Sequence, residues 1–131
     1  MKKDIELLKV EDIGIAAVPG EDPDFWDIYI LNLHEEAIKN VFIVASGYGE
    51  IDGEVRKSSL MRYYFEKIEA LDIHKIESLP VSLFDLTNEY WVSFSMNNYL
   101  YDKRYLFVPG SLLPLNFITI PFIEQKGVLI R

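Results

Sequence analysis

The chain has 131 residues, of which 50% are hydrophobic and 26% charged, and it has no cysteine. This size fits one domain, and the composition excludes long disordered, collagen-like and disulfide-stapled classes. The net charge of −8, from 13 basic and 21 acidic side chains, opposes nucleic-acid binding, because an acidic protein repels a polyanion. We therefore expect a single acidic domain over residues 1–131 that binds no nucleic acid.

The N-terminus does not have the pattern of an export signal. Asp4 and Glu6 interrupt the apolar segment that would have to follow Lys2 and Lys3. No apolar run approaches the ~18 residues that a membrane helix needs. The sequence therefore predicts a cytoplasmic protein that does not bind a membrane.

Strand patterns dominate the first half of the chain, and an aromatic content of 14% also favours β structure. Ile13–Val18 is an apolar run that ends at Pro19-Gly20, and it predicts an opening strand. Phe25–Leu33 is apolar on both of its alternating faces, so we expect a central or covered strand. Val41–Ala45 predicts a third strand, and Asp52-Gly53 predicts a hairpin turn because both residues tolerate positive φ.

The stretch from Ser58 to Leu79 fits two different structures. Several of its apolar residues recur at helical spacing, and a serine is available as the N-cap. Its aromatic run is β-prone, however, and Asp72 divides the stretch into pieces of strand length. We predict two strands, Leu60–Ile68 and His74–Leu79, and a single helix over Ser58–Leu71 stays open as the alternative.

The last third of the chain predicts further strands. Tyr90–Met96 has the clearest period-two alternation, and Asn97-Asn98 indicates a turn into a partner strand at Leu100–Val108. Phe117–Phe122 predicts a strand that its proline confines to an edge or a strand end, and Gly127–Ile130 is a short apolar tail.

Many short strands joined by turns within one domain are typical of a sandwich of two sheets. The fold that we predict is therefore all-β. It is a single antiparallel β-sandwich of about 7–8 strands, immunoglobulin-like, over residues 1–131.

Residues for nucleophilic catalysis are scarce in this sequence. A serine nucleophile needs a base within hydrogen-bond reach, and His34 and His74 are the only histidines. Ser46-Gly47-Tyr48-Gly49 has half of a nucleophile elbow, but Val44 occupies the position of the leading glycine. We expect a protein that is not an enzyme and has no catalytic residues.

Three acidic side chains, Glu50, Asp52 and Glu54, flank the predicted hairpin turn and form a weak candidate site for Ca²⁺. The ligand order of a calcium-binding loop is absent, so a charged hairpin tip is the preferred interpretation. The acidic cluster Glu21–Asp27 is interpreted in the same way. Neither a phosphate-binding loop nor a dinucleotide motif is present, and we expect no metal and no cofactor.

Aromatic residues around Leu100–Val108 form the candidate binding surface. In an extended strand Tyr99, Tyr101 and Tyr105 point to one side, and we expect Trp91 of the neighbouring strand near that side. Tyrosine and tryptophan on such a face stack sugars or anchor a protein partner. Packing within the core and burial in a homodimer are the alternatives.

Five segments together resemble a group of short bacterial proteins without an established function: Trp26–Asn32, Val41–Tyr48, Lys57–Arg62, Asn88–Phe94 and Gly127–Leu129. The resemblance supports a strand over Leu60–Ile68 and implies no function. Some members of the group carry the label phenylalanyl-tRNA synthetase. Such an enzyme would need a larger catalytic sheet, a glycine-rich strand and ATP-binding arginines, whereas the arginines of this chain are in no such motif. We judge that label to be a misannotation.

These patterns lead to one expected function and two alternatives. We expect a non-catalytic cytoplasmic β-sandwich that acts through contacts with a protein partner or through self-association as a homodimer. One alternative is a small-ligand or carbohydrate-binding module that uses the aromatic face. The other is a hydrolase with an unrecognised carboxylate pair, which would need two facing carboxylates in a cleft.

Overall fold

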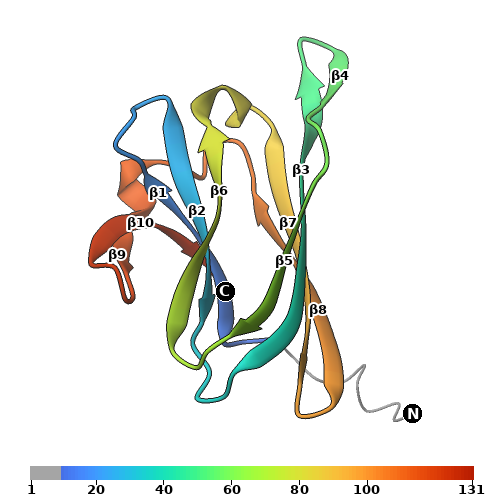
Figure 1. Cartoon of the computed structure of the whole chain (residues 1–131). Coiled ribbons are helices and arrows are strands. Elements are labelled where there is room, and N and C mark those ends of the chain that lie inside the picture. The colour runs from blue at the N-terminus through green and yellow to red at the C-terminus, as the bar shows by residue number, and fades with distance from the viewer. Residues whose placement is uncertain (1–9) are drawn as a thin grey trace.

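The computed structural model describes residues 10–131, which form ten β-strands and two short 3₁₀ helices, without an α-helix (Figure 1). An all-β fold is therefore confirmed, whereas the prediction of seven or eight strands was too low. The part of the N-terminal segment before Val10 lies outside the described residues. The strands are β1 (Ile13–Pro19), β2 (Phe25–Asn32), β3 (Ile38–Ile51), β4 (Glu54–Lys57), β5 (Met61–Ile68), β6 (Asp72–Pro80), β7 (Thr87–Met96), β8 (Tyr99–Phe107), β9 (Ile118–Ile120) and β10 (Gln125–Ile130).

The strands form two antiparallel sheets. The first, called sheet I, has the order β6-β2-β1-β10-β9. The second, called sheet II, has the order β4-β3-β7-β8, and β5 also pairs with β3. β5 and β6 are consecutive, so their hairpin passes from sheet II to sheet I along one side of the molecule, and above their shared turn the two strands separate (Figure 1).

The main core lies between the sheets. Alternation along β3 shows how the sequence builds it: Val41, Ile43 and Ala45 are buried, while Phe42 between them is exposed. Sheet I contributes Ile28 and Ile30 from β2. The other buried members of this core are Ile13, Ile15, Ala17, Ile38, Ile68, Ile76, Leu79, Tyr90, Val92, Phe94, Tyr105, Phe107, Leu112 and Val128.

A second, smaller cluster covers the outer face of sheet I. Val18 and Leu31 are fully or almost fully buried there, and Ile120 of β9 packs with them. This covering and the place of β2 between β6 and β1 confirm the prediction of a central, covered strand, although Phe25 at its start is exposed. β10 runs so close to β1 that a Cβ on Gly127 would lie 2.4 Å from the carbonyl oxygen of Ala17. Only glycine fits at this contact.

The predicted turns are confirmed by the backbone. Asp52 and Gly53 have φ of 53° and 81°, which places both in the left-handed region and joins β3 to β4 in a tight hairpin. Asn97 and Asn98 have φ of 52° and 66° and join β7 to β8 in the same manner. Asparagine, aspartate and glycine tolerate this conformation at low cost.

The ambiguous stretch forms two strands, β5 and β6, as predicted. β5 pairs with β3 and β6 pairs with β2, so each finds backbone partners that a helix would not use. The predicted strand over Phe117–Phe122 is shorter than expected, because only Ile118–Ile120 pairs with β10 and Pro121 begins a turn. Within residues 10–131, no helix is long and apolar enough to cross a bilayer.

Candidate functional site

The outer face of sheet II presents a patch of large apolar side chains. Phe42 of β3 is 54% exposed, Tyr64 of β5 is 51% exposed and Trp91 of β7 is 39% exposed. In the strand register Phe42 lies opposite Tyr64, and Val44 lies opposite Trp91, so these side chains share one face. Leu106 of β8 extends the patch. We call Phe42, Val44, Tyr64, Trp91 and Leu106 the outer patch.

Ring contacts and one arginine order this patch. The rings of Phe42 and Tyr64 lie 4.7 Å apart, and the guanidinium of Arg104 lies 4.2 Å from the centre of the Trp91 ring, within cation–π range. The carboxylate of Glu89 lies 3.8 Å from Arg104 and accepts a 2.9 Å hydrogen bond from the hydroxyl of Tyr48. That hydrogen bond raises the pKa of Tyr48, so its hydroxyl stays a neutral donor. The patch is therefore apolar at its centre and polar at its margin.

The structure separates the four residues of the predicted aromatic face. Trp91 pairs with Arg104 and points outward, so the prediction that it shares a side with the tyrosines is wrong. Tyr105 lies in the core and donates a 2.7 Å hydrogen bond to the carbonyl of Ile13. The ring of Tyr101 stacks on buried Phe94 at 5.2 Å. Tyr99 is half-buried at the start of β8. Tyr101 and Tyr105 thus follow the packing alternative of the sequence analysis.

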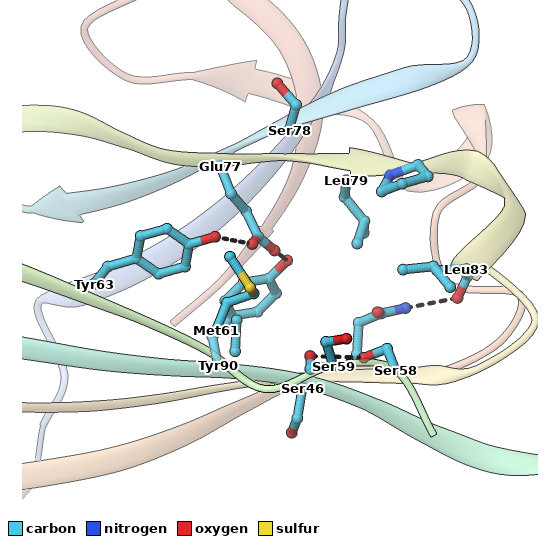
Figure 2. Close-up of a pocket in the computed structure, with 13 residues that line it drawn as sticks. Ser46, Ser58, Ser59, Met61, Tyr63, Glu77, Ser78, Leu79, Leu83 and Tyr90 are labelled. Carbon is cyan, nitrogen blue, oxygen red and sulfur yellow. Dashed lines mark hydrogen bonds between the residues drawn. The ribbon is translucent and has the colours of Figure 1, made fainter. Parts of the chain in front are cut away.

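A pocket of about 420 Å³ opens between β5 of sheet II and β6 of sheet I (Figure 2). Figure 2 shows Glu77, Tyr63 and Tyr90 converging on it, whereas Ser46 and Ser78 point away. The residues that line the pocket are Ala45, Ser46, Ser58, Ser59, Met61, Tyr63, Glu77, Ser78, Leu79, Pro80, Leu83, Asn88 and Tyr90.

Glu77 is the charged group of this pocket. Its two carboxylate oxygens accept hydrogen bonds from two hydroxyls, that of Tyr63 at 2.5 Å and that of Tyr90 at 2.7 Å. Burial and the neighbouring carboxylate raise the pKa of both tyrosines above the ordinary value of 10.0, so both remain neutral donors at neutral pH. The three side chains come from β5, β6 and β7, and therefore join the two sheets.

A clamp between β3 and the loop before β5 shapes the rim of the pocket. The backbone N–H of Gly47 donates to the Ser58 hydroxyl at 2.7 Å, and the backbone N–H of Ser58 donates to the Gly47 carbonyl at 2.8 Å. The amide nitrogen of buried Asn88 donates to the Leu83 carbonyl at 2.9 Å. A Cβ on Gly47 would lie only 3.0 Å from the Ser58 hydroxyl oxygen. Glycine at this position therefore leaves room for the Ser58 side chain in the clamp.

The other candidates from the sequence are not brought together. His34 lies 3.9 Å from Asp12 and His74 lies 3.4 Å from Asp72, so each histidine neighbours a carboxylate, and Ser46 takes part in neither pair. Within the described part of the chain, no three His, Cys, Asp or Glu side chains are arranged to hold a metal ion. Glu50, Asp52 and Glu54 therefore form no metal site in this structure.

Sequence analysis did not identify Glu77, and the reason is a β-bulge. Ile28 of β2 pairs with Glu77, but the next residue, Tyr29, pairs with Lys75, so Ile76 is an extra residue in β6. Lys75 consequently points outward to Asp27 at 3.0 Å, while Ile76 is buried and Glu77 enters the pocket. Strict alternation along His74–Leu79 would place Ile76 and Glu77 on opposite faces of the sheet, and no local sequence signal marks the bulge that brings both inward.

Comparisons of the chain with protein-family models, curated proteins and solved structures found no match.

Proposed function

We propose that this protein is a non-catalytic binding domain that acts through protein contacts made by the outer patch of sheet II. The observation that carries the proposal is the difference between the two outer faces. A second apolar cluster covers the face of sheet I, whereas Phe42, Tyr64 and Trp91 on sheet II lie exposed. Exposed aromatic residues beside an arginine are typical of interface hot spots.

A second copy of this chain is the partner that the charges of this face favour. Arg62 and Arg104 lie at the two ends of the row that contains Val44 and Trp91, and Asp102 lies in the adjacent row. A two-fold axis between these two rows would place Arg104 of each copy over Asp102 of the other. Such self-complementarity is what a symmetric dimer requires.

We also propose that the sandwich is immunoglobulin-like in its connectivity. In immunoglobulin domains strands A, B and E are neighbours in one sheet, and strands C, F and G are neighbours in the other. The orders β1-β2-β6 and β3-β7-β8 support this assignment. β9 and β10 extend sheet I beyond that arrangement, and β4 and β5 extend sheet II.

The composition of the pocket supports a non-catalytic role. Glycoside hydrolysis by acid and base needs two carboxylates across a cleft, and Glu77 is the single carboxylate among the residues that line this pocket. Both of its oxygens already accept hydrogen bonds from tyrosines.

Sedimentation equilibrium tests the self-association. We expect the wild-type protein to form a dimer and Phe42→Lys to weaken the dimer at least about tenfold, because a charge would be buried in the apolar centre. Leu115→Lys is the matched control: Leu115 is 83% exposed and lies outside the patch, so the same change should leave the dimer intact. A wild-type protein that stays monomeric at about 1 mM, or equal weakening by both variants, would refute the dimer.

A further inference from the structure

We propose that the pocket between β5 and β6 binds a small organic cation, a primary ammonium group on a short apolar body, with its charge against Glu77. The proposal is independent of the outer patch, because the pocket lies between the sheets and the patch lies on the outside of sheet II.

Among residues 10–131, the Glu77 carboxylate has no counter-ion within ion-pair distance. Four lysine– or arginine–carboxylate ion pairs and two histidine–carboxylate contacts form within residues 10–131, and none of them includes Glu77. A partly buried charge is costly unless it is paired, and the hydroxyls of Tyr63 and Tyr90 are neutral donors that leave the net charge in place. A bound cation would supply the missing charge.

The residues that line the pocket oppose the binding of anions. None of the residues that line the pocket is lysine, arginine or histidine. A carboxylate has about four acceptor positions on its two oxygens, and the tyrosines occupy one on each oxygen. The remaining positions fit an ammonium group, which has three donors and no acceptor.

The walls of the pocket are largely apolar. Met61, Leu79 and Leu83 line the pocket with apolar surface, and the rings of Tyr63 and Tyr90 lie next to the carboxylate. A volume of about 420 Å³ is at the small end of the range of ligand sites, which indicates a small molecule.

The test uses three probes of equal length that differ in charge: n-butylammonium, n-butanol and butyrate. Amide chemical shifts of the full wild-type chain are followed during titration. We expect saturable shifts at Tyr63, Glu77 and Ser58 with n-butylammonium, binding at least about tenfold weaker with n-butanol, and no binding of butyrate. Equal binding of n-butylammonium and n-butanol, or no saturable shift at these residues with n-butylammonium, would overturn the proposal without any variant.

Variants then locate the charge. Glu77→Gln keeps an acceptor but removes the charge, and we expect it to weaken n-butylammonium binding about tenfold. Glu66→Gln makes the same change in net charge at an exposed position of β5 and should bind as the wild type does. Tyr63→Phe keeps the carboxylate and frees one acceptor position, so binding should persist. If folded Glu77→Gln binds n-butylammonium as tightly as Glu66→Gln does, Glu77 is not the anchor and the proposal fails.

Discussion

Removal of the Tyr90 hydroxyl tests the link between Glu77 and the two sheets. Tyr90 is 1% exposed, and its hydroxyl donates to Glu77 at 2.7 Å. Tyr90→Phe removes a hydrogen bond to a charged acceptor, and such bonds contribute about 1.5–3 kcal/mol to stability. We therefore expect the variant to fold and to lose about that much free energy of unfolding at pH 8.

Alkaline pH should reduce this loss. Burial raises the pKa of Tyr90 above 10.0, so the folded protein holds this proton after the unfolded chain has released it. A group with a raised folded pKa contributes stability that is complete below the unfolded pKa and declines as pH rises above it. At pH 11, one unit above the unfolded value, this decline is about 1.4 kcal/mol for one tyrosine. The stability difference between wild type and Tyr90→Phe should therefore narrow by that amount between pH 8 and pH 11.

Urea unfolding at a series of pH values measures both effects. Tyr105→Phe is the parallel variant, because burial also raises the pKa of Tyr105 but its hydroxyl donates to the neutral carbonyl of Ile13. Its free energy of unfolding at pH 8 should fall by a smaller amount, about 0.5–1.5 kcal/mol. Its stability difference from the wild type should narrow between pH 8 and pH 11 as that of Tyr90→Phe does. If the difference in free energy of unfolding between the wild type and Tyr90→Phe stays constant or widens from pH 8 to pH 11, the reasoning about Tyr90 is refuted.

Three further predictions concern the fold and use the same unfolding measurement. Gly127→Ala should lose about 3 kcal/mol or fail to fold, because its Cβ would overlap the Ala17 carbonyl, and a loss below about 1 kcal/mol would contradict the close approach. Gly53→Ala should lose only about 1 kcal/mol, because φ is 81° but no atom lies within 4 Å of the new Cβ; equal losses for the two variants would contradict this comparison. Asn32→Leu should lose about 3 kcal/mol or more, because buried Asn32 donates to three backbone carbonyls and accepts from the His34 N–H, and a near-neutral effect would show that water replaces these bonds.

Local features of the fold were predictable from neighbouring residues. The alternation of Tyr90–Met96 became β7, and the pairs Asp52-Gly53 and Asn97-Asn98 became tight turns with positive φ. These features follow from the side-chain period of a strand and from the few residue types that tolerate left-handed backbone. The strand period and the tolerance of left-handed backbone are both properties of a few neighbouring residues. They can therefore be predicted from the sequence of a short segment alone.

Local patterns alone do not decide between a helix and two strands for the stretch from Ser58 to Leu79. Its apolar residues satisfy helical spacing, yet β5 and β6 form because β3 and β2 offer their backbone groups as partners. β4 was not predicted, and the strand that became β9 was predicted too long, for a related reason: each is short, and its extent is set by the strand that it pairs with.

What the amino-acid sequence determined by itself was therefore the β class, most strand positions and the turns. The tertiary structure decided which side chains meet. Trp91 lies on the outer patch because β7 pairs with β8 in the register that places it opposite Arg104, and alternation within each strand does not set the register between strands. Glu77 enters the pocket because a bulge at Ile76 shifts β6 by one residue against β2. Register and bulges result from the packing of whole sheets, and so the candidate sites appeared only when the sheets were assembled.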